Sequence, residues 1–333
     1  MNDTEHRTSG VEHRTRNLGL ATSHFVTGGA GFIGSHLVDR LIAEKNEVTV
    51  YDNLASGKTE NIKHHFGKEG FNFIQADLLN SGTLTQAMKG HEIIWHLGAN
   101  TDIPTGNRIT DLDLNNDTIA TRNVLEAMRQ NDIDKIIFAS SACVYGDVPL
   151  VPLAETFGPL FPINLYGAGK LACEGLLTAY SHLFGINVWM FRFGNVVGSR
   201  MGHGVIYDFI HKLKQNPEEL EILGDGNQEK NFFLVEDCID GMLYAFRNSG
   251  KQYDVFNLGC NFTVKVSVIA RIVVEEMGLK NVKFKYTGGK RGWPGDAPYV
   301  MFDTSKMERL GGKAKYTSEE AVRIATRRLL GKE

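Results

Sequence analysis

Short apolar runs alternate with longer amphipathic stretches along the chain from residue 23 onwards. The runs rich in β-branched and aromatic residues predict strands over residues 24–27, 47–51, 71–75, 93–96, 135–140 and 187–193. The stretches between them have apolar residues at three- and four-residue spacing, which predicts helices over 34–45, 83–88, 117–130 and 167–184. This alternation is typical of a parallel sheet covered by helices, so we predict a doubly wound α/β fold.

The alternation loosens after residue 194 into glycine-rich turns and shorter helices, predicted over 205–215, 235–247 and 266–278. A last helix is predicted over 318–330, because Thr317 and Glu320 have the spacing of a capping box and Glu319 adds negative charge to the first turn. Residues 1–22 show no periodicity. Too few of them are apolar for burial to offset the conformational entropy lost when they become ordered. We therefore predict a flexible tail over 1–22, a sheet domain over 23–194 and a smaller α/β subdomain over 195–333, with a strand returned from the last part to the sheet left open.

Composition restricts the class of protein. The chain has 333 residues, of which 42% are hydrophobic and 23% charged, and its formal net charge is −3. This length supports two coupled subdomains, and the slight negative charge offers no basic surface for nucleic acid. The chain contains no run of about 18 apolar residues, so no membrane span is predicted. The cysteines are far apart and lack metal-ligand spacing, which predicts no metal site and favours a reducing cytoplasm: Cys143, Cys173, Cys238 and Cys260.

Gly28, Gly31 and Gly34 lie at three-residue intervals between a predicted strand and a predicted helix. In this context the first glycine permits a tight turn, the second lets the backbone approach a pyrophosphate, and the third lets the helix pack on the sheet. Asp52 ends the next strand, where its carboxylate can accept both ribose hydroxyls of an adenosine. Asp52 would repel a 2′-phosphate and residues 53–56 include no arginine to receive one, so the pattern favours NAD over NADP.

Tyr166 and Lys170 are four residues apart at the start of a predicted helix and therefore lie on one face of it. Ser141 follows the predicted strand 135–140, at the carboxyl end where doubly wound sheets bind ligands. A phenol with a pKa of about 10 is a poor base at neutral pH, but a lysine cation and the cationic nicotinamide would favour its phenolate. We predict that Tyr166 accepts a proton while Ser141 hydrogen-bonds the reacting hydroxyl and a hydride passes to the nicotinamide.

Together these motifs resemble the extended short-chain dehydrogenase/reductases of the NAD-dependent epimerase/dehydratase family. The resemblance covers residues 24–330 and rests on the segments TGGAGFIG (27–34), DNL (52–54), DL (77–78), SSACVYG (140–146), YGAGK (166–170), RFGNVVG (192–198), GDG (224–226) and VED (235–237). The segments GVIYDFI (204–210) and RGWPGD (291–296) look like those of archaeal-type UDP-galactose 4-epimerases. The resemblance implies a Rossmann-type fold, tightly bound NAD, and interconversion of UDP-glucose and UDP-galactose, or a close UDP-hexose pair, through a 4-keto intermediate.

Residue roles also follow from the resemblance. The positions that bind NAD in the family correspond here to Gly28, Gly31, Phe32, Ile33, Gly34, Asp52, Asn53, Ser56, Gly57, Asp77, Leu78, Leu97, Gly98, Ala99, Tyr166, Lys170 and Phe193. Those that bind the nucleotide sugar correspond to Ser141, Asn195, Val205, Lys230, Arg291 and Asp296. Among them, Arg291 would meet phosphate and Asp296 the ribose. A homodimer is implied as well, with the helices over 117–130 and 167–184 at its interface.

Several positions depart from the family pattern. Ala142 and Cys143 stand where 4,6-dehydratases have an Asp-Glu pair and where decarboxylating relatives commonly have Glu, so neither reaction is expected. Asp117 stands where relatives usually have Asn near the cofactor, Gly169 where they often have Ser or Thr, and Lys230 where many have Arg. These three differences are expected to alter substrate fit and not the class of reaction.

Two other functions are weighed against 4-epimerisation. Cys143 has a position similar to that of the thiol acid/base of GDP-mannose 3,5-epimerase, so a nucleotide-sugar 3,5-epimerase that uses Cys143 is the first alternative. A catalytically silent NAD-sensing protein on the same scaffold is the second. The presence together of Ser141, Tyr166 and Lys170 argues against a silent protein.

Overall fold

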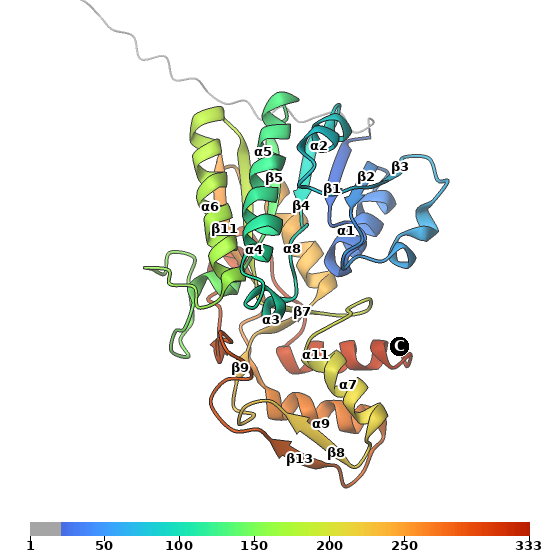
Figure 1. Cartoon of the computed structure of the whole chain (residues 1–333), viewed down its shortest axis with the longest axis vertical. Coiled ribbons are helices and arrows are strands. Elements are labelled where there is room, and N and C mark those ends of the chain that lie inside the picture. Colours follow the sequence, from blue (N-terminus) through green and yellow to red (C-terminus); the bar gives the residue numbers. More distant parts are fainter. Residues whose placement is uncertain (1–20) are drawn as a thin grey trace, which may run out of the picture.

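A seven-stranded parallel sheet forms the centre of the upper part of the molecule (Figure 1). The computed structural model describes residues 21–333, so the tail predicted over 1–22 lies almost entirely outside the described residues. The strand order is β11-β6-β5-β4-β1-β2-β3. The bounds are β1 (Ser23–Thr27), β2 (Glu47–Asp52), β3 (Phe71–Gln75), β4 (Ile93–His96), β5 (Lys135–Ser141), β6 (Asn187–Phe193) and β11 (Tyr253–Leu258). The predicted α/β fold with a parallel sheet is confirmed.

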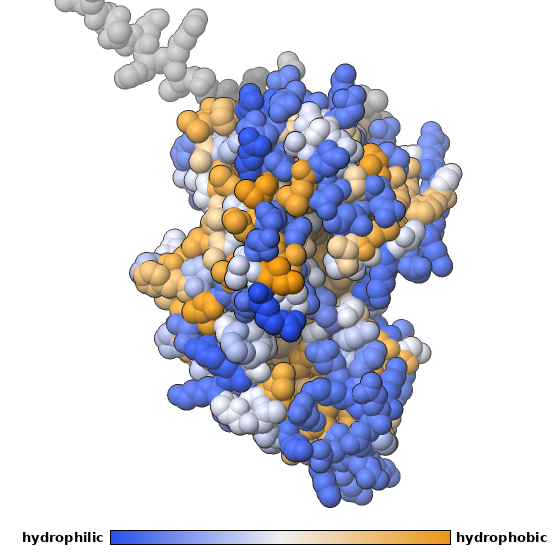
Figure 2. Space-filling model, viewed as in Figure 1, coloured by the Kyte–Doolittle hydropathy of each residue, from blue (hydrophilic) through white to orange (hydrophobic). Residues whose placement is uncertain are grey.

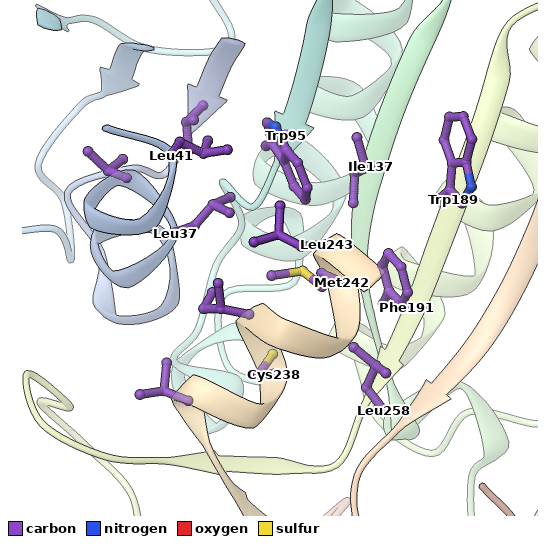
Figure 3. Packing of buried hydrophobic residues seen from close by; sticks show 14 of the residues in the cluster. Leu37, Leu41, Trp95, Ile137, Trp189, Phe191, Cys238, Met242, Leu243 and Leu258 are labelled. Atoms are coloured by element: carbon purple, nitrogen blue, oxygen red, sulfur yellow. The ribbon is translucent and has the colours of Figure 1, made fainter. Parts of the chain in front are cut away.

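Helices cover both faces of this sheet. One face carries α1 (Phe32–Ala43) and α8 (Val235–Asn248), and the other carries α2 (Ser81–Met88), α5 (Ala120–Gln130) and α6 (Leu165–Phe184). Figure 3 shows Leu37 and Leu41 of α1 with Met242 and Leu243 of α8 around the fully buried Trp95 of β4. The apolar stripe of each helix is therefore removed from water against the sheet, which is the main force that holds the layers together.

The lower part is smaller and contains three helices packed around a short two-stranded sheet (Figure 1). The helices are α7 (Val205–Gln215), α9 (Val266–Met277) and α11 (Ser318–Leu329), and the strands are β8 (Glu219–Ile222) and β13 (Lys283–Tyr286). The capping box predicted for the last helix is present, because Thr317 and Glu320 each accept a hydrogen bond from the other's backbone N–H. Between the two parts lie β7 (Asn195–Val197) with β10 (Phe232–Leu234), and β12 (Val264–Lys265) with β9 (Glu229–Lys230) and β14 (Tyr299–Val300).

The chain passes between the two parts more than once. After β10 it enters α8, packs on the upper sheet and adds β11 beside β6 in parallel register. It then leaves for β12 and α9 of the lower part. The sequence pattern left this return of a strand open, and the structure shows it.

Four predicted helix starts differ from the observed ones. α1 begins at Phe32, α2 at Ser81 and α6 at Leu165, each two residues before its prediction. Gly31 and Asn164 take the extended N-cap conformation, and Asn80 caps α2 by accepting from the Thr83 N–H. The helix predicted over 117–130 becomes α-helical only at Ala120, because residues Leu114–Ile119 form a π-helix (η3). A π-helical turn contains an additional residue that apolar spacing does not reveal, and such turns are frequent at functional sites.

Short helical turns complete the connections. They are η1 (Thr59–Asn61), η2 (Lys63–His65), α3 (Ile103–Gly106), α4 (Asp111–Asp113), η4 (Ala142–Tyr145) and α10 (Ser305–Leu310). Within residues 21–333 there is no helix of the length and apolarity that a membrane crossing requires.

Candidate active site

The glycine loop between β1 and α1 leaves no room for side chains. Gly28 has a φ of +67°, which favours glycine, and its N–H donates to the Tyr51 carbonyl at 3.0 Å. A Cβ atom on Gly34 would lie 2.2 Å from the Gly28 carbonyl oxygen, so only glycine lets α1 begin this close to β1. The first turn of α1 therefore presents its N–H groups at the carboxyl end of the sheet, an arrangement that binds phosphate.

Asp52 lies directly beneath this loop. Its Oδ2 accepts from the Ala30 N–H at 3.0 Å and its Oδ1 from the Leu54 N–H at 2.8 Å. Burial raises the pKa of this carboxyl above its usual value, and the two backbone hydrogen bonds oppose that rise. A Cβ atom on Gly57 would lie 2.9 Å from both carboxylate oxygens, so the backbone passes closely over Asp52.

Other residues predicted to bind NAD meet at the same edge. Asn53 donates to Asp77 Oδ2 at 2.9 Å, which joins the ends of β2 and β3. The Gly98 N–H donates to Thr27 Oγ1 at 3.1 Å, and a Cβ atom on Gly98 would lie 2.9 Å from Leu78 Cδ1. The structure thus brings the glycine loop, Asp52, Asn53, Asp77, Leu78 and Gly98 to one edge of the sheet.

Tyr166 and Lys170 lie on consecutive turns of α6, with Ser141 opposite them at the end of β5. The Lys170 side chain is buried, and its Nζ is 5.5 Å from the centroid of the Tyr166 ring and 4.9 Å from that of Phe138. Asn164 caps α6 by accepting from the Gly167 N–H at 2.7 Å, which fixes the turn that carries Tyr166. Asn164 was missed in the sequence, although an Asn just before a helix is a recognised capping signal.

The pKa of the Tyr166 phenol lies well above its usual value of 10. Burial is the largest cause, the Asp117 carboxylate raises the pKa further, and a hydrogen bond with Ser141 opposes the rise. A further positive charge beside the phenol, in addition to that of Lys170, would lower this pKa, because an opposite charge nearby favours an ionised group.

Cys143 is half-buried at the start of η4, next to Ser141. Its N–H donates to Ser141 Oγ at 3.2 Å. Burial raises the pKa of the thiol, while hydrogen bonds with Ser141 and Asn164 and the charge of Lys230 act in the opposite direction. The group at this position is therefore a neutral thiol at physiological pH.

Of the residues predicted to bind the nucleotide sugar, Lys230, Arg291 and Asp296 form one cluster. Lys230 Nζ lies 2.5 Å from Asp296 Oδ1, and the Gly292 N–H donates to Asp296 Oδ2 at 3.1 Å. Arg291 donates to the Asp296 carbonyl oxygen and to Asp147 Oδ2, each at 2.5 Å. The sequence missed both the Lys230–Asp296 pair and the role of Asp147 in holding Arg291.

Asn195 and Val205 have other surroundings. Asn195 starts β7 and donates to the Asn231 carbonyl oxygen at 3.0 Å. Val205 is the first residue of α7 and follows Gly204 as N-cap. Among the described residues, no hydrogen bond or ion pair joins these two side chains to Lys230, Arg291 or Asp296.

A buried ionic network supports the end of β5 from behind. Glu174 of α6 accepts from Ser140 Oγ at 2.6 Å and forms two hydrogen bonds with Arg192, at 3.0 and 2.7 Å. Arg192 also donates to the Tyr145 hydroxyl at 3.0 Å. The network therefore ties β5, β6, η4 and α6 together next to Ser141.

One cluster with metal-ligand chemistry lies away from these residues, on α1 and η2. His64 Nε2 and His65 Nε2 lie 2.8 and 2.7 Å from Asp39 Oδ1. The other oxygen of Asp39 pairs with the Arg200 guanidinium at 2.7 Å. Because that cation neutralises the carboxylate, the cluster is accounted for by ion pairing.

Comparison with known proteins places the chain in a family. Residues 24–259 match the NAD dependent epimerase/dehydratase family. The chain belongs to this family. It is 33% identical over 306 residues to a putative UDP-glucose 4-epimerase of Methanocaldococcus jannaschii, with 90% of this chain and 95% of that protein covered. It is 32% identical over 260 residues to UDP-glucuronic acid decarboxylase 1 of Xenopus tropicalis, with 76% and 60% covered.

Solved structures of the family have the same fold. A crystal structure of a UDP-galactose 4-epimerase matches with a TM-score of 0.82 at 36% identity, covering 92% of this chain and 98% of that one. A UDP-N-acetylglucosamine 4-epimerase from Methanobrevibacter ruminantium matches with a TM-score of 0.84 at 29% identity, covering 94% and 99%. The relatives thus share a fold and differ in the sugar they act on.

The chain is accordingly an NAD-dependent epimerase-family enzyme, and NAD is its cofactor. The residues present fit this cofactor. Glycine is required at Gly28 and Gly34, because a Cβ atom there would clash with the backbone of Gly98 or of Gly28, and the Asp52 carboxylate lies beneath the loop that they form. No arginine lies close behind Asp52 in the sequence to receive a 2′-phosphate.

Proposed function

We propose that this protein is a nucleotide-sugar 4-epimerase that interconverts UDP-glucose and UDP-galactose, or a close UDP-hexose pair. The observation that carries the proposal is the placement of Tyr166 and Lys170 on one face of α6, with Ser141 facing them from the end of β5. This arrangement suits removal of a proton from a sugar hydroxyl. Relatives at 28–36% identity include several UDP-sugar 4-epimerases, which supports the same reaction class here.

Each residue has a distinct part in this reaction. Ser141 hydrogen-bonds the C4 hydroxyl of the sugar, and Tyr166 accepts its proton. Lys170 supplies positive charge to the phenolate of Tyr166. NAD, when bound, would supply both the acceptor and the later donor of the C4 hydride, so no second oxidant is needed. Rotation of the 4-keto sugar about its diphosphate exposes its other face, and Tyr166 then returns the proton.

The nucleotide is held at the boundary of the two parts. We assign Arg291 and Lys230 to the diphosphate, because both are cationic and lie in one cluster, and Asp296 to the uridine ribose. Asn195 and Val205 are assigned to the same substrate by family resemblance alone. Asp296 has both carboxylate oxygens engaged by the protein, so binding through Asp296 requires Lys230 or the Gly292 N–H to exchange partners.

The 3,5-epimerase alternative depends on Cys143 as an acid/base. The thiol adjoins Ser141 and Asn164, so its position suits a contact with the sugar. Its raised pKa disfavours a role as base, because little thiolate forms at neutral pH. Cys143→Ser separates the two functions: 4-epimerisation keeps most of its turnover, whereas thiol acid/base chemistry loses it.

We also propose a homodimer through the outer faces of α5 and α6. Leu183 and Phe184 at the end of α6 are 72% and 50% exposed, and Figure 2 shows apolar surface over this end of the helix. Such exposed apolar groups are commonly covered in an assembly. We place the protein in a reducing cytoplasm, since its four cysteines are free. Sedimentation of the wild-type protein and of Leu183→Glu tests the dimer.

The function is tested with a panel of UDP- and GDP-hexoses, whose products are resolved by chromatography and NMR. Conversion of UDP-glucose to UDP-galactose that falls by about 10²–10⁴-fold in Tyr166→Phe is the expected result. Tyr244→Phe is the matched control, because it removes an exposed tyrosine hydroxyl on α8 whose one hydrogen bond within residues 21–333 is to the Leu310 carbonyl oxygen. A product altered at C3 or C5 favours the Cys143 chemistry, and no turnover of any sugar favours the silent NAD-binding protein.

A further inference from the structure

Two buried carboxylates, Asp113 and Asp117, lie under the start of α6. Relatives usually have Asn at the position of Asp117. Asp113 and Asp117 are each 1% exposed. One oxygen of each accepts from Asn100, at 2.7 Å from Nδ2 and 3.1 Å from N–H. The second oxygen of each, Oδ2, has no hydrogen-bond partner within residues 21–333. A buried carboxylate oxygen without a hydrogen-bond partner lowers the stability of the folded chain. Such a group therefore calls for an explanation other than stability.

The space beside Asp117 exists because residue 169 is glycine. A Cβ atom on Gly169 would lie 3.3 Å from both Cβ and Oδ2 of Asp117. Gly169 lies between Tyr166 and Lys170 on α6, so Asp117 Oδ2 faces the segment that carries the proposed catalytic pair. A serine or threonine at 169 would place a hydroxyl donor against this oxygen.

The titratable groups around Asp117 come from three elements. Asp113 is on α4, Tyr166, Lys170 and Cys173 are on α6, and His96, whose pKa is lowered by burial and by the Lys170 charge, ends β4. Within this group Lys170 is the cation, and it forms no ion pair within 4 Å among the described residues. Burial raises the pKa of Asp117 to about 6, and the Lys170 charge opposes that rise. Asp117 therefore changes its charge in the pH range where the enzyme would work.

Ionised Asp117 and Lys170 have opposite effects on Tyr166. Lys170 Nζ lies 5.5 Å from the centroid of the Tyr166 ring, where a positive charge favours the phenolate. The Asp117 carboxylate acts in the opposite direction and is, after burial, the largest influence that keeps the phenol protonated. With asparagine at 117, Asp113 would be the remaining carboxylate that opposes Lys170.

We propose that Asp117 acts through Tyr166 as an electrostatic control residue: its carboxylate, with Oδ2 left unpartnered, offsets the Lys170 ammonium and so sets the pH above which Tyr166 serves as a base. This rests on the proposed function only in taking Tyr166 as the base. Asp117 needs no contact with the substrate for this role. Gly169 is the matching feature, because it leaves Asp117 Oδ2 without a hydrogen-bond donor.

The proposal is tested first by the pH profile of kcat/KM. Asp117→Asn preserves shape and the bond from the Asn100 N–H but removes the charge, so the acid limb is expected to move to lower pH. On that limb kcat/KM rises about tenfold for each pH unit of displacement. Asp113→Asn is expected to move the limb in the same direction by less, since Asp113 is a smaller influence on Tyr166. Asp111→Asn, an exposed carboxylate on the same short helix as Asp113, is the control and leaves the limb in place.

Gly169→Ser gives the opposite prediction. Its hydroxyl can donate to Asp117 Oδ2, which favours the ionised carboxylate and moves the acid limb to higher pH. If Asp117→Asn lowers kcat equally at every pH and leaves the limb where it was, Asp117 has a structural role and the proposal is wrong.

A second readout does not depend on turnover. In the NAD-bound protein with ¹³Cζ-labelled tyrosine, the Tyr166 signal is identified by its loss in Tyr166→Phe and then titrated. The phenol of Asp117→Asn is expected to ionise at lower pH than that of the wild type. A midpoint unchanged by the substitution, or a signal that it leaves unaltered up to the highest pH at which both proteins stay folded, overturns the proposal. If no sugar is turned over, the proposed function fails and this titration still decides the role of Asp117.

Discussion

The Lys230 ammonium lies 2.5 Å from a carboxylate oxygen of Asp296, although 66 positions separate them in the chain. The pair is largely buried, with side-chain exposures of 19% and 5%, and it joins β9 to the loop before β14. Both residues were predicted to bind the nucleotide sugar. The chain therefore neutralises two groups of its candidate substrate site against each other.

Breaking this pair should harm stability and substrate binding together. Asp296→Asn leaves the Lys230 charge without its partner, at a cost of about 2 kcal/mol in unfolding free energy, reduced from the fully buried case by partial exposure. Urea unfolding measures the loss. In the double variant Lys230→Met, Asp296→Asn, part of the loss should be recovered, because no unpaired charge remains. Equal stability of single variant and wild type would show that solvent already screens the pair.

Substitution of Gly34 tests the role of the glycine loop, and substitution of Gly175 is the control. In Gly34→Ala the new methyl group would clash with the Gly28 carbonyl oxygen, so α1 must move. The affinity for NAD is expected to fall by at least about tenfold. Gly175→Ala, in the middle of α6, meets nothing within 4 Å and should stabilise the chain by about 0.5–1 kcal/mol. Cofactor titration by fluorescence and urea unfolding check the two variants. NAD binding of Gly34→Ala at wild-type strength would contradict the placement of the pyrophosphate.

The buried ionic network behind Ser141 should make a large contribution to stability. Glu174→Gln removes the charge that faces Arg192, and both side chains are less than 10% exposed, at 9% and 6%. The expected loss is about 3 kcal/mol, because a buried guanidinium is left without its counter-ion. Glu275→Gln breaks a pair with Arg323 whose side chains are 59% and 42% exposed, and it should cost less than about 0.5 kcal/mol. Similar losses in the two variants would refute the distinction.

His24 gives stability a pH dependence. It is buried and accepts from Trp95 Nε1 at 2.9 Å, and burial lowers its pKa from 6.5 to about 4. Between about pH 6.5 and 4, His24 is therefore protonated in the unfolded chain but not in the folded chain. The free energy of unfolding falls as the pH falls through this window. The loss from His24 alone is about 2 kcal/mol between about pH 7.5 and pH 5.

Chemical denaturation at a series of pH values measures this loss. His24→Gln keeps an acceptor for Trp95 and should flatten the profile by that amount. A slope unaltered by the substitution would mean that His24 is protonated in the folded chain.

Much of the sheet could be predicted because parallel strands buried on both faces are continuous apolar runs. The run over 187–193 is β6 without any change of bounds, and the five other predicted strands differ by at most one residue at an end. β11 was not predicted: in YDVFNL the alternation with Asp254 and Asn257 weakens the apolar run. The tertiary contact with β6, which the local pattern does not contain, selects it as a strand.

The site was predictable where chemistry is local to a motif. Tyr166 and Lys170 share a helix face at a fixed spacing, so the sequence alone places them together. The pairing of Lys230 with Asp296 and the unpartnered oxygen of Asp117 depend on packing between distant segments, and spacing does not report it. The roles of the predicted NAD and sugar contacts stay predictions until a complex is measured.

The return of α8 and β11 to the upper sheet has a consequence for dividing the chain. A fragment that ended at residue 194 would lack both elements, and β6 would become an open edge with a full row of unsatisfied N–H and C=O groups. The apolar floor now covered by Met242 and Leu243 would be exposed to water beside that edge. Such a fragment is expected to aggregate, so the nucleotide-binding part cannot be expressed or exchanged between proteins as a module without the chain that follows it.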